Sequence, residues 1–348
     1  MPPLFDVKPV DKRFYEERIE SFLPDALIDI HTHVWLERFA HKQNSDGRSV
    51  TWPGRVAKDN PVEDLIETYR LLFPGKKATP LMFGTIDADI DAENDYVAAC
   101  SRKTGFPSVI FSDPAWSAAE LEKRIRAGGF LGVKSYLSLA PAYLPGGEVR
   151  IFDFFPPHQL EVLNRHGSLM MLHIPRPARL RDPVNLAQML EFESRYPDLR
   201  VIVAHVGRAY CREDLGTAFE TLAGTRRMMF DISANTNDFV FERLIRAVGP
   251  SRILFGSDLP ILRMRMKRIC EDGHYVNLVP RGLYGDVSAD KNMRDVDPPE
   301  SERFTFFMYE EIDAFRRAAE RTGLSRSDVE RVFYRNALGL LKSVGWKG

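Results

Sequence analysis

The sequence predicts an α/β fold, a (β/α)8 TIM barrel, from three observations. Most of eight short β-rich runs are continuously apolar, which is typical of parallel strands that are covered on both faces. Amphipathic helical segments separate these runs, and eight strand–helix repeats indicate a closed barrel, with an open doubly wound sheet as the alternative. The 348 residues, 44% of them hydrophobic, supply enough chain and core for one such domain.

The expected elements follow one another in a regular order. Each helical segment carries apolar residues at intervals of three and four, and several are followed by the glycines that commonly end helices. The strands are expected at residues 26–33, 80–86, 107–113, 130–138, 168–174, 200–206, 228–233 and 252–258. The helices between and after them are expected at 61–72, 92–103, 113–127, 157–166, 182–196, 213–222 and 237–248, with two more at 309–322 and 325–343.

Two polar segments interrupt the repeat. Residues 34–59 follow the first expected strand, and residues 259–304 follow the last. Loops of this length tend to be functional or disordered, and in a barrel both would lie over the carboxyl-terminal rim, where active sites form. We therefore expect a single domain over 1–348, with both segments as loop insertions above the active site and residues 305–348 as C-terminal helices. The second insertion and the tail offer surfaces for a homodimer.

The composition excludes several classes of protein. Lys and Arg number 48 and Asp and Glu 49, a net charge of −1, whereas nucleic-acid binders need a basic surplus. No run of about 18 apolar residues exists for a membrane span, and residues 1–22 lack the apolar stretch of a signal peptide. Cys100, Cys211 and Cys270 are widely spaced and odd in number, so neither a disulfide scaffold nor a CxxC-type metal site is expected. These features predict a cytoplasmic enzyme with no nucleic-acid or membrane partner.

The first expected strand ends in a pair of histidines. In the run Asp-Ile-His-Thr-His, His31 and His33 are two residues apart. Side chains alternate along a strand, so both imidazoles project from the same face. If that face lines the barrel, the two rings converge at its mouth.

Three further polar residues end otherwise apolar strands. His173, His205 and Asp258 lie at the ends of the fifth, sixth and eighth expected strands. A buried imidazole or carboxylate without a partner is costly, and a divalent cation removes that cost because both groups are standard ligands of zinc and its neighbours. The sequence therefore predicts a metal site at the carboxyl ends of the strands.

Together these motifs resemble those of the amidohydrolase superfamily. The pattern combines residues 29–33, Gly-Val-Lys at 132–134, the single histidines that end two later strands, and Phe-Gly-Ser-Asp at 255–258. With the Asn-Ala pair at 336–337, the chain is similar over residues 27–342 to the amidohydrolase-related branch, which holds lactonases and decarboxylases.

The resemblance implies a divalent metal centre and its ligands. His31, His33, His173 and Asp258 would bind the ion, for which zinc is expected and manganese is an alternative. His205 would either bind a second metal or lie beside the first and polarise the substrate.

The number of metal ions depends on the chemical state of Lys134. Binuclear members of the superfamily carry a carboxylated lysine on the fourth strand, and that group bridges two metals. We favour an ordinary Lys134 ammonium that attracts a substrate carboxylate, and therefore one ion rather than two. Tyr136 would share the same face of the strand and hydrogen-bond the substrate.

The expected mechanism follows from that ligand set. The metal would activate a water, Asp258 would take its proton as the general base, and His205 would stabilise the charge that develops on the attacked carbonyl oxygen. Arg176 and Arg208, each three residues past a strand-ending histidine, would bind a carboxylate.

The expected activity is hydrolysis of a C–O or C–N bond, in a lactone, ester or amide, of a small carboxylated and hence anionic molecule. A decarboxylase of an aromatic or unsaturated acid is the main alternative, since Trp35, Trp52 and the two arginines also suit a planar anion. A barrel whose metal is only structural is a third alternative. Asp231, which ends the seventh expected strand, would orient a metal ligand or cap a helix.

Overall fold

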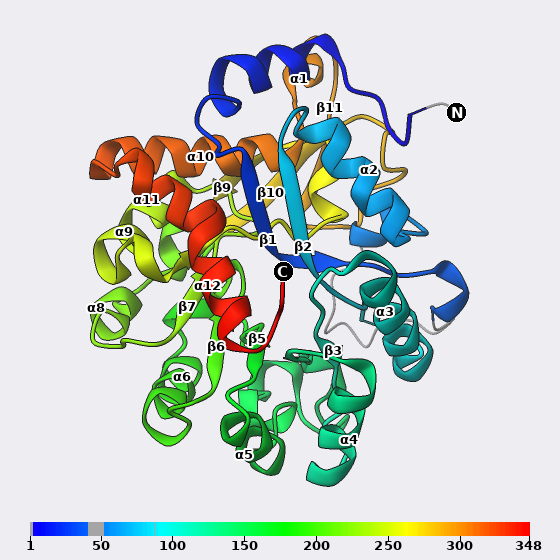
Figure 1. Cartoon of the computed structure of the whole chain (residues 1–348). Helices are drawn as coiled ribbons and strands as arrows, with labels where there is room; N and C mark the ends of the chain where they lie inside the picture. The colour runs from blue at the N-terminus through cyan, green and yellow to red at the C-terminus, as the bar shows by residue number, and fades with distance from the viewer. Residues whose placement is uncertain (1–2, 41–51, 87) are drawn as a thin grey trace.

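The computed structural model describes residues 3–40, 52–86 and 88–348 (Figure 1). Parallel strands alternate with helices along most of the chain, as the sequence predicts. Every barrel strand overlaps its expected range, and most are shorter. The strands are β1 Ala26–His33, β2 Lys77–Phe83, β3 Ile110–Phe111, β4 Gly132–Lys134, β5 Leu169–Leu172, β6 Arg200–Val203, β7 Met229–Asp231 and β8 Ile253–Leu254.

The eight barrel strands are divided between two sheets. β1 pairs with β2, and β3 to β8 pair in sequence order as a six-stranded sheet. Between β2 and β3, the Val109 N–H donates to Met82 O at 3.0 Å, and between the segment after β8 and β1, the His33 N–H donates to Leu259 O at 2.8 Å. An isolated parallel bridge marks each of these seams. Hydrogen bonds therefore connect all the barrel strands, and the predicted barrel fold is confirmed.

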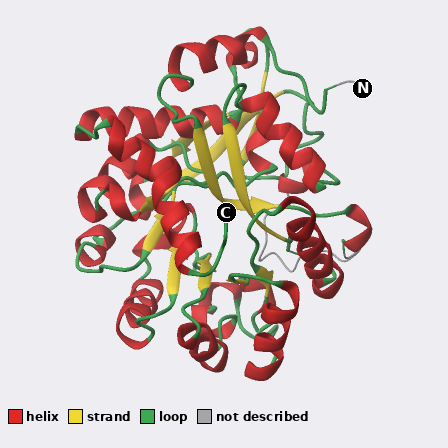
Figure 2. Ribbon diagram, viewed as in Figure 1, coloured by secondary structure: helices red, strands yellow, loops and turns green. Residues whose placement is uncertain are grey.

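Helices surround the strands, shown in red around yellow in Figure 2. Local capping sets where α4 begins: the Ser117 hydroxyl accepts from the Glu120 N–H at 3.2 Å, so the helix starts at Ala118 and not at residue 113 as expected. The expected helix at 213–222 is α-helical only in its second half. The helices of the barrel are α2 Val62–Leu72, α3 Ile90–Thr104, α4 Ala118–Gly128, α5 Pro157–Arg165, α6 Pro183–Arg195, the short turn α7 His205–Arg208, α8 Ala218–Leu222 and α9 Asp238–Val248.

The C-terminal segment fills the amino-terminal end of the barrel. α10 Phe307–Thr322 packs on α9, and α11 Arg326–Glu330, a π-helical turn and α12 Asn336–Ser343 follow it. Ala337 and Leu341 join the apolar side chains inside the strand ring. Figure 1 shows α12 and the C-terminus lying across the ring. Both expected C-terminal helices are thus present, and the opposite end of the barrel is the one that carries the histidines.

The insertion after β8 contains a small sheet, which corrects its expectation as a loop. β9 Lys267–Glu271, β10 His274–Pro280 and β11 Met293–Val296 form three strands with β10 in the centre, and we call them the insertion sheet. β9 is largely exposed and carries the charged residues Lys267 and Arg268 at its start. Apolar runs therefore do not reveal this sheet.

The first insertion is described only in part. Residues 41–51 of the expected segment 34–59 lie outside the described residues. On either side of them the chain forms short 3₁₀ turns, one of which contains Arg55. The Arg55 guanidinium donates to Tyr284 O at 2.8 Å and to Asp286 O at 2.7 Å, so the two insertions contact each other.

A disulfide joins the insertion sheet to the barrel, contrary to the expectation from the cysteine count. Cys211, which follows β6, and Cys270 on β9 are bonded, with their Cα atoms 5.9 Å apart and a sequence separation of 59. Only the fold brings these two residues together, so their spacing gives no sign of the pair. Cys100 on α3 is buried and is not part of a disulfide.

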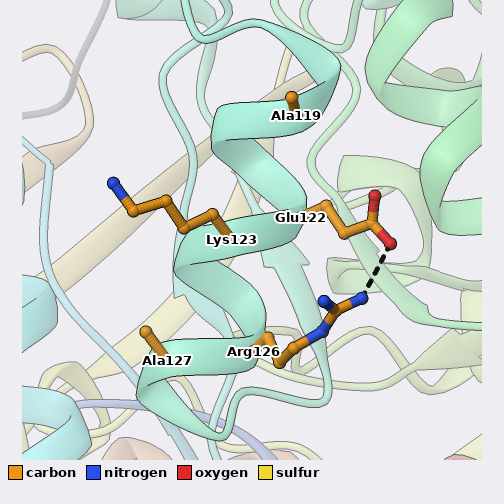
Figure 3. A pocket seen from close by; sticks show the side chains of 5 residues that line it. All are labelled: Ala119, Glu122, Lys123, Arg126 and Ala127. Carbon is orange, nitrogen blue, oxygen red and sulfur yellow. Dashed lines mark hydrogen bonds and ion pairs between the residues drawn. The ribbon is translucent and has the colours of Figure 1, made fainter.

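The outer surface of α4 carries charged side chains. A shallow hollow there is lined by charged and alanine side chains, and Glu122 pairs with Arg126 at 3.0 Å (Figure 3). Glu122 also lies 2.8 Å from His166. Among the described residues, no helix combines the length and the apolar character needed to cross a membrane. The lining residues of the hollow are Ala119, Glu122, Lys123, Arg126 and Ala127.

Candidate metal centre

The polar residues that end four strands meet at one end of the barrel. His31 and His33 belong to β1, and His173, His205 and Asp258 follow β5, β6 and β8 within a few residues. The His205 ring centre lies 4.8 Å from that of His31 and 5.4 Å from that of His173. His31, His173, His205 and Asp258 are at most 8% exposed. The structure thus brings these predicted residues together at the carboxyl ends of the strands.

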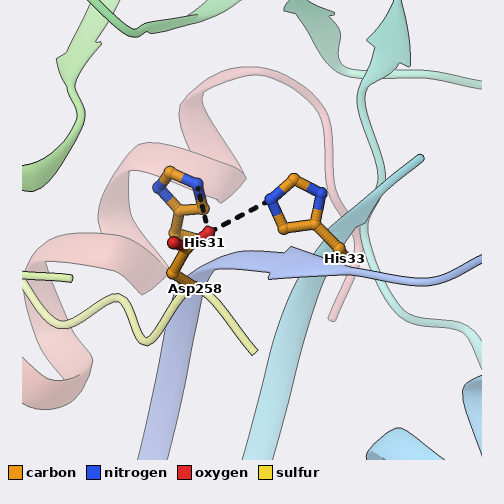
Figure 4. A group of neighbouring side chains, drawn as sticks. All are labelled: His31, His33 and Asp258. Carbon is orange, nitrogen blue, oxygen red and sulfur yellow. Dashed lines mark hydrogen bonds and ion pairs between the residues drawn. The ribbon is translucent and has the colours of Figure 1, made fainter. Parts of the chain in front are cut away.

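The group that could hold a metal ion consists of His31, His33 and Asp258 (Figure 4). Asp258 Oδ1 lies 3.4 Å from His31 Nε2 and 3.2 Å from His33 Nε2. Potential ligand atoms of the three residues all lie within 4.8 Å of one another. Two imidazole nitrogens and one carboxylate oxygen therefore converge on one point.

The other nitrogen of each of these imidazoles already has a partner. His31 Nδ1 donates to Asp231 Oδ2 at 2.9 Å, and His33 Nδ1 donates to Gly84 O at 2.7 Å. A carboxylate and a carbonyl oxygen can only accept, so both Nδ1 atoms carry the proton. In the neutral rings, Nε2 then presents a lone pair toward Asp258.

Charge states make this group suited to a cation. Burial lowers the pKa of His33, although the adjacent Asp258 carboxylate opposes this. Burial raises the pKa of Asp258, but the interactions with His33 and the other nearby imidazoles outweigh it and lower that pKa overall. Two lone pairs and a carboxylate therefore face one another, and a divalent ion would relieve their mutual repulsion. The residues present fit a zinc-type ion.

A second group, His31, His205 and Asp231, is held together by its own hydrogen bonds. Asp231 accepts from His31 Nδ1 and also from the His205 backbone N–H at 2.8 Å. His205 Nδ1 lies 3.1 Å from the carbonyl oxygen of Ser233 and 2.9 Å from its Oγ. Protons already lie between these atoms, so this group orients the histidines. Of the two roles expected for Asp231, its hydrogen bonds fit the orientation of the histidines. It does not cap the following helix, because Asn237 does so.

His173 stands apart from both groups. Its ring centre lies 4.6 Å from that of Tyr136. Burial and the adjacent Arg208 lower the pKa of His173 well below the ordinary value, so the ring is neutral. Within the described residues its buried Nδ1 has no hydrogen-bond partner. An unpaired, buried nitrogen of this kind remains available as a ligand atom.

Lys134 is a buried cation beside the same centre. It is 2% exposed, and its ammonium lies 5.5 Å from the ring centre of Phe83. Burial lowers the pKa of Lys134 to about 8, while Asp258 and Asp231 act in the opposite direction. At neutral pH the side chain is therefore mostly charged and can attract an anion.

The two predicted rim arginines also have partners within the protein. Arg176 Nε donates to Asp182 Oδ2 at 3.1 Å, and Asp182 caps α6. Arg208 Nη1 donates to Ile174 O at 3.1 Å and to Pro175 O at 3.0 Å. Arg208 therefore braces the chain that leaves His173, and Arg176 braces the start of a helix.

Two of the predicted aromatic residues lie beside the histidines. Trp35 donates from its indole nitrogen to Lys58 O at 2.8 Å, and its ring centre lies 6.2 Å from that of His33. Tyr136 lies against His173. The side chain of Trp52, the third predicted aromatic residue, is not among those that the structure describes.

The backbone is strained at the ends of two strands. His205, Val206 and Arg208 have φ of 55°, 50° and 59°, and Asp258 has φ of 66°. Such left-handed conformations cost about 1–3 kcal/mol each for residues other than glycine and gather at functional sites. They direct His205 and Asp258 out of the strand path and into the centre.

Sequence reasoning missed the residues behind His33. The Asn60 amide donates to His33 O at 2.6 Å, and Glu93 of α3 accepts from the Thr85 N–H at 2.8 Å. A side chain at Gly84 would collide with the Glu93 carboxyl, so the close approach requires glycine there. Burial raises the pKa of Glu93 to about 7. The local sequence around each of these residues has no pattern that would predict its contact.

The fold and this centre define an α/β-barrel protein with a candidate metal site made of histidine and aspartate. A family model described as "Amidohydrolase" matches residues 28–342, and the chain belongs to this family, which is metal-dependent. The resemblance drawn from the motifs is thereby confirmed. No curated protein matches the chain.

Several solved structures share the fold. An amidohydrolase from Burkholderia multivorans with bound zinc has a TM-score of 0.57 and 13% identity, over 91% of this chain and 99% of that one. A probable 2-pyrone-4,6-dicarboxylic acid hydrolase from Acinetobacter baumannii has a TM-score of 0.53 and 14% identity, over 91% of this chain and 99% of that one. A 2,6-dihydroxybenzoate decarboxylase from Rhizobium has a TM-score of 0.53 and 14% identity, over 92% of this chain and 100% of that one. The neighbours thus include both hydrolases and decarboxylases.

Proposed function

We propose that this protein is a metal-dependent hydrolase that cleaves a C–O or C–N bond, in a lactone, ester or amide, of a small carboxylated molecule. The observation that carries the proposal is the convergence of His31 Nε2, His33 Nε2 and Asp258 Oδ1 as three electron-pair donors with both Nδ1 protons held elsewhere. We further propose one zinc ion, with His173 as the fourth ligand, because the second histidine group is closed by its own hydrogen bonds.

Asp258 is the proposed general base. A divalent ion at this site would supply Lewis acidity, which polarises a carbonyl group and lowers the pKa of water. Asp258 is ionised, and with Oδ1 toward the imidazoles its other oxygen takes a proton from the attacking water. The carboxyl group then passes this proton to the leaving oxygen or nitrogen as the C–O or C–N bond breaks. One water is consumed, and Asp258 returns to its starting state.

Of the two roles expected for His205, metal binding and polarisation of the substrate, only the second needs a proton on Nε2. Its Nδ1 proton is directed to Ser233, and burial lowers the pKa of His205 to about 4. The neutral ring therefore offers a lone pair at Nε2 and cannot donate a hydrogen bond from that atom to an oxyanion. We propose His205 as a further ligand or proton acceptor.

The positive groups around the centre support an anionic substrate. Lys134 is a buried ammonium, and the charge of Arg208 reaches His173. Both positive charges favour a substrate carboxylate there. Tyr136 and Trp35 would cover the apolar part of the same molecule.

A decarboxylase is the second candidate. The rings of Trp35 and Tyr136 flank His33 and His173, an arrangement that suits a planar aromatic acid. In that reaction the C–C bond to the carboxylate breaks, carbon dioxide leaves, and the ring carbon accepts a proton.

Metal analysis and two probe substrates test the proposal. Protein purified without added metal should contain one equivalent of zinc, whereas two equivalents would indicate a carboxylated Lys134. With 2-pyrone-4,6-dicarboxylate the hydrolase should release protons; carbon dioxide from 2,6-dihydroxybenzoate would instead support the lyase. His33→Asn should remove the metal, while His166→Asn, at the exposed position that follows α5, serves as the matched control. Full zinc content in His33→Asn would contradict the ligand assignment.

A cytoplasmic location also belongs to this proposal. Cell fractionation of the native protein, together with the oxidation state of Cys211 and Cys270 after rapid alkylation, tests it directly.

A further inference from the structure

We propose that the Cys211–Cys270 disulfide is a latch, reducible by external thiols, that holds the insertion sheet against the wall of the candidate metal centre. Its effect on turnover rests on the proposed function, whereas its effect on the position of the sheet does not. Three features carry the inference: where the sheet is attached, where the disulfide lies, and what the sheet touches.

The insertion sheet leaves and rejoins the barrel at a narrow neck. The Met266 N–H donates to Thr305 O at 3.1 Å, and the Phe307 N–H donates to Met264 O at 2.7 Å. The chain before β9 and the chain before α10 are therefore held side by side. Part of the sheet has a small apolar cluster of its own, formed by Val276, Leu278 and Phe304 with Ile269 and Val296.

The disulfide lies at the opposite end of the first hairpin. β9 runs from the neck to a tight turn at Asp272 and Gly273, whose φ values are 48° and 75°. Cys270 precedes this turn by two residues, so the bond to Cys211 anchors the tip of the hairpin to the loop after β6. The attachment at the neck is backbone hydrogen bonding, and the attachment at the tip is covalent.

The hairpin that the disulfide anchors packs against one aromatic residue of the barrel. Tyr275 pairs directly with Cys270 across the hairpin, so both side chains lie on the same face. The Tyr275 ring meets Tyr210 edge to face, with centres 4.9 Å apart. The guanidinium of Arg268 lies 5.0 Å from the Tyr210 ring centre and 4.4 Å from that of Tyr275. Tyr210 is the residue immediately before Cys211.

Tyr210 belongs to the wall of the metal centre. Its ring centre lies 6.3 Å from that of His205. Two residues earlier, Arg208 donates to the carbonyls of Ile174 and Pro175, directly after His173. The latch therefore contacts the loop that follows His205, in which Arg208 also holds the chain after His173, and we assign Cys211 and Cys270 as positioning residues.

The bond is accessible to a reductant. Cys270 is exposed, although Cys211 is buried. A dithiol attacks as the thiolate at the Cys270 sulfur, the Sγ–Sγ bond breaks, and exchange with the second thiol completes the reduction. Two electrons and two protons pass from the dithiol, which becomes a disulfide, to Cys211 and Cys270, which become thiols.

Hydrogen exchange and thiol counting test the latch in the full-length protein. In the oxidised wild type, the reagent 5,5′-dithiobis(2-nitrobenzoate) should detect no thiol before denaturation and one after it, from Cys100. Treatment with dithiothreitol should add two thiols and raise amide exchange in residues 267–280 by about tenfold. Cys270→Ser should reproduce the rise without reductant, and Cys100→Ala, which leaves the disulfide intact, should not.

Kinetics test the positioning role. If the closed arrangement falls to between a third and a tenth of the population, KM for 2-pyrone-4,6-dicarboxylate rises by about 3–10-fold in reduced wild type and in Cys270→Ser. Because the latch touches no reacting atom, kcat stays within about twofold of that of the oxidised enzyme.

The outcomes separate the two proposals. Three thiols detected after denaturation of mildly oxidised protein, or unchanged exchange in 267–280 after complete reduction, would overturn the latch. Increased exchange with no change in KM would overturn its positioning role. Increased exchange in a protein that hydrolyses none of the probes supports the latch and counts against the proposed hydrolase.

Discussion

Asp231→Asn is the sharpest test of how the histidines are oriented. In the wild type the carboxylate accepts from His31 Nδ1 through one oxygen, and from the backbone N–H groups of His205 and Ser233 through the other. An amide of the same shape has one oxygen and one NH₂. In either orientation a donor then faces a donor, at His31 or at the two backbone groups.

The size of the effect follows from those contacts. A hydrogen bond to a charged acceptor contributes about 1.5–3 kcal/mol, so the metal-free variant should lose about that much free energy of unfolding. Without its carboxylate partner, His31 can place the proton on Nε2, the nitrogen that faces Asp258. Loss of such an orienting partner lowers metal affinity by about 10–100-fold, equivalent to about 1.4–2.7 kcal/mol.

Two measurements separate orientation from stability. Zinc affinity is measured by competition with a chromogenic chelator, and stability by urea unfolding of the metal-free protein. Asp198→Asn, at an exposed position after α6, is the matched control and should change neither. A folded Asp231→Asn protein with wild-type zinc affinity would refute the orienting role.

Three further changes test other parts of the molecule. Asp258→Asn should lower kcat/KM by about 10³-fold with an unchanged circular dichroism spectrum, because an amide cannot take the proton. Near-normal turnover would contradict the assignment of Asp258 as the general base. Gly207→Ala should cost about 2–4 kcal/mol in urea unfolding, since φ is +63° and the new Cβ would collide with Leu180; an equally stable variant would contradict this. Glu93 has a pKa of about 7 when folded, against 4.5 ordinarily, so wild-type stability should fall between pH 4.5 and 7, as the unfolded chain loses the proton first. In Glu93→Gln the fall in the free energy of unfolding between pH 4.5 and 7 should be smaller than in the wild type by up to about 3 kcal/mol. If the free energies of unfolding of the two proteins change in parallel with pH, this explanation is wrong.

The barrel could be predicted because each strand is buried on both faces. Such strands are continuous apolar runs, and β1 was found at its expected residues 26–33. The other strands end earlier than the runs do, and after β5, β6 and β8 the chain that has left the sheet carries His173, His205 and Asp258 into the centre. His31, His33 and Asp258 could be found for the same reason: each is a polar residue at the end of an apolar run.

The remaining features depend on contacts between distant segments. His173 was expected with the other ligands, yet its direction is set by the chain after β5, which Arg208 braces from another loop. The Cys211–Cys270 pair and the insertion sheet have no local pattern, since charged residues fill β9 and 59 positions separate the cysteines. Glu93 reaches Thr85 only after α3 has docked on the barrel.

The two seams of the strand ring give the metal centre a mechanical role. His31 and His33 lie on the two-stranded arc of β1 and β2, whereas Asp258 follows β8 on the six-stranded arc. Between these arcs, near the centre, an isolated bridge and a few backbone hydrogen bonds, among them one from the Asp258 N–H to His31 O at 2.7 Å, replace a regular ladder. An ion bound by residues of both arcs would add a further link across this joint. At a thousandfold excess over Kd, that link would add about 4 kcal/mol to stability, so chelators would loosen the barrel itself as well as stop its chemistry.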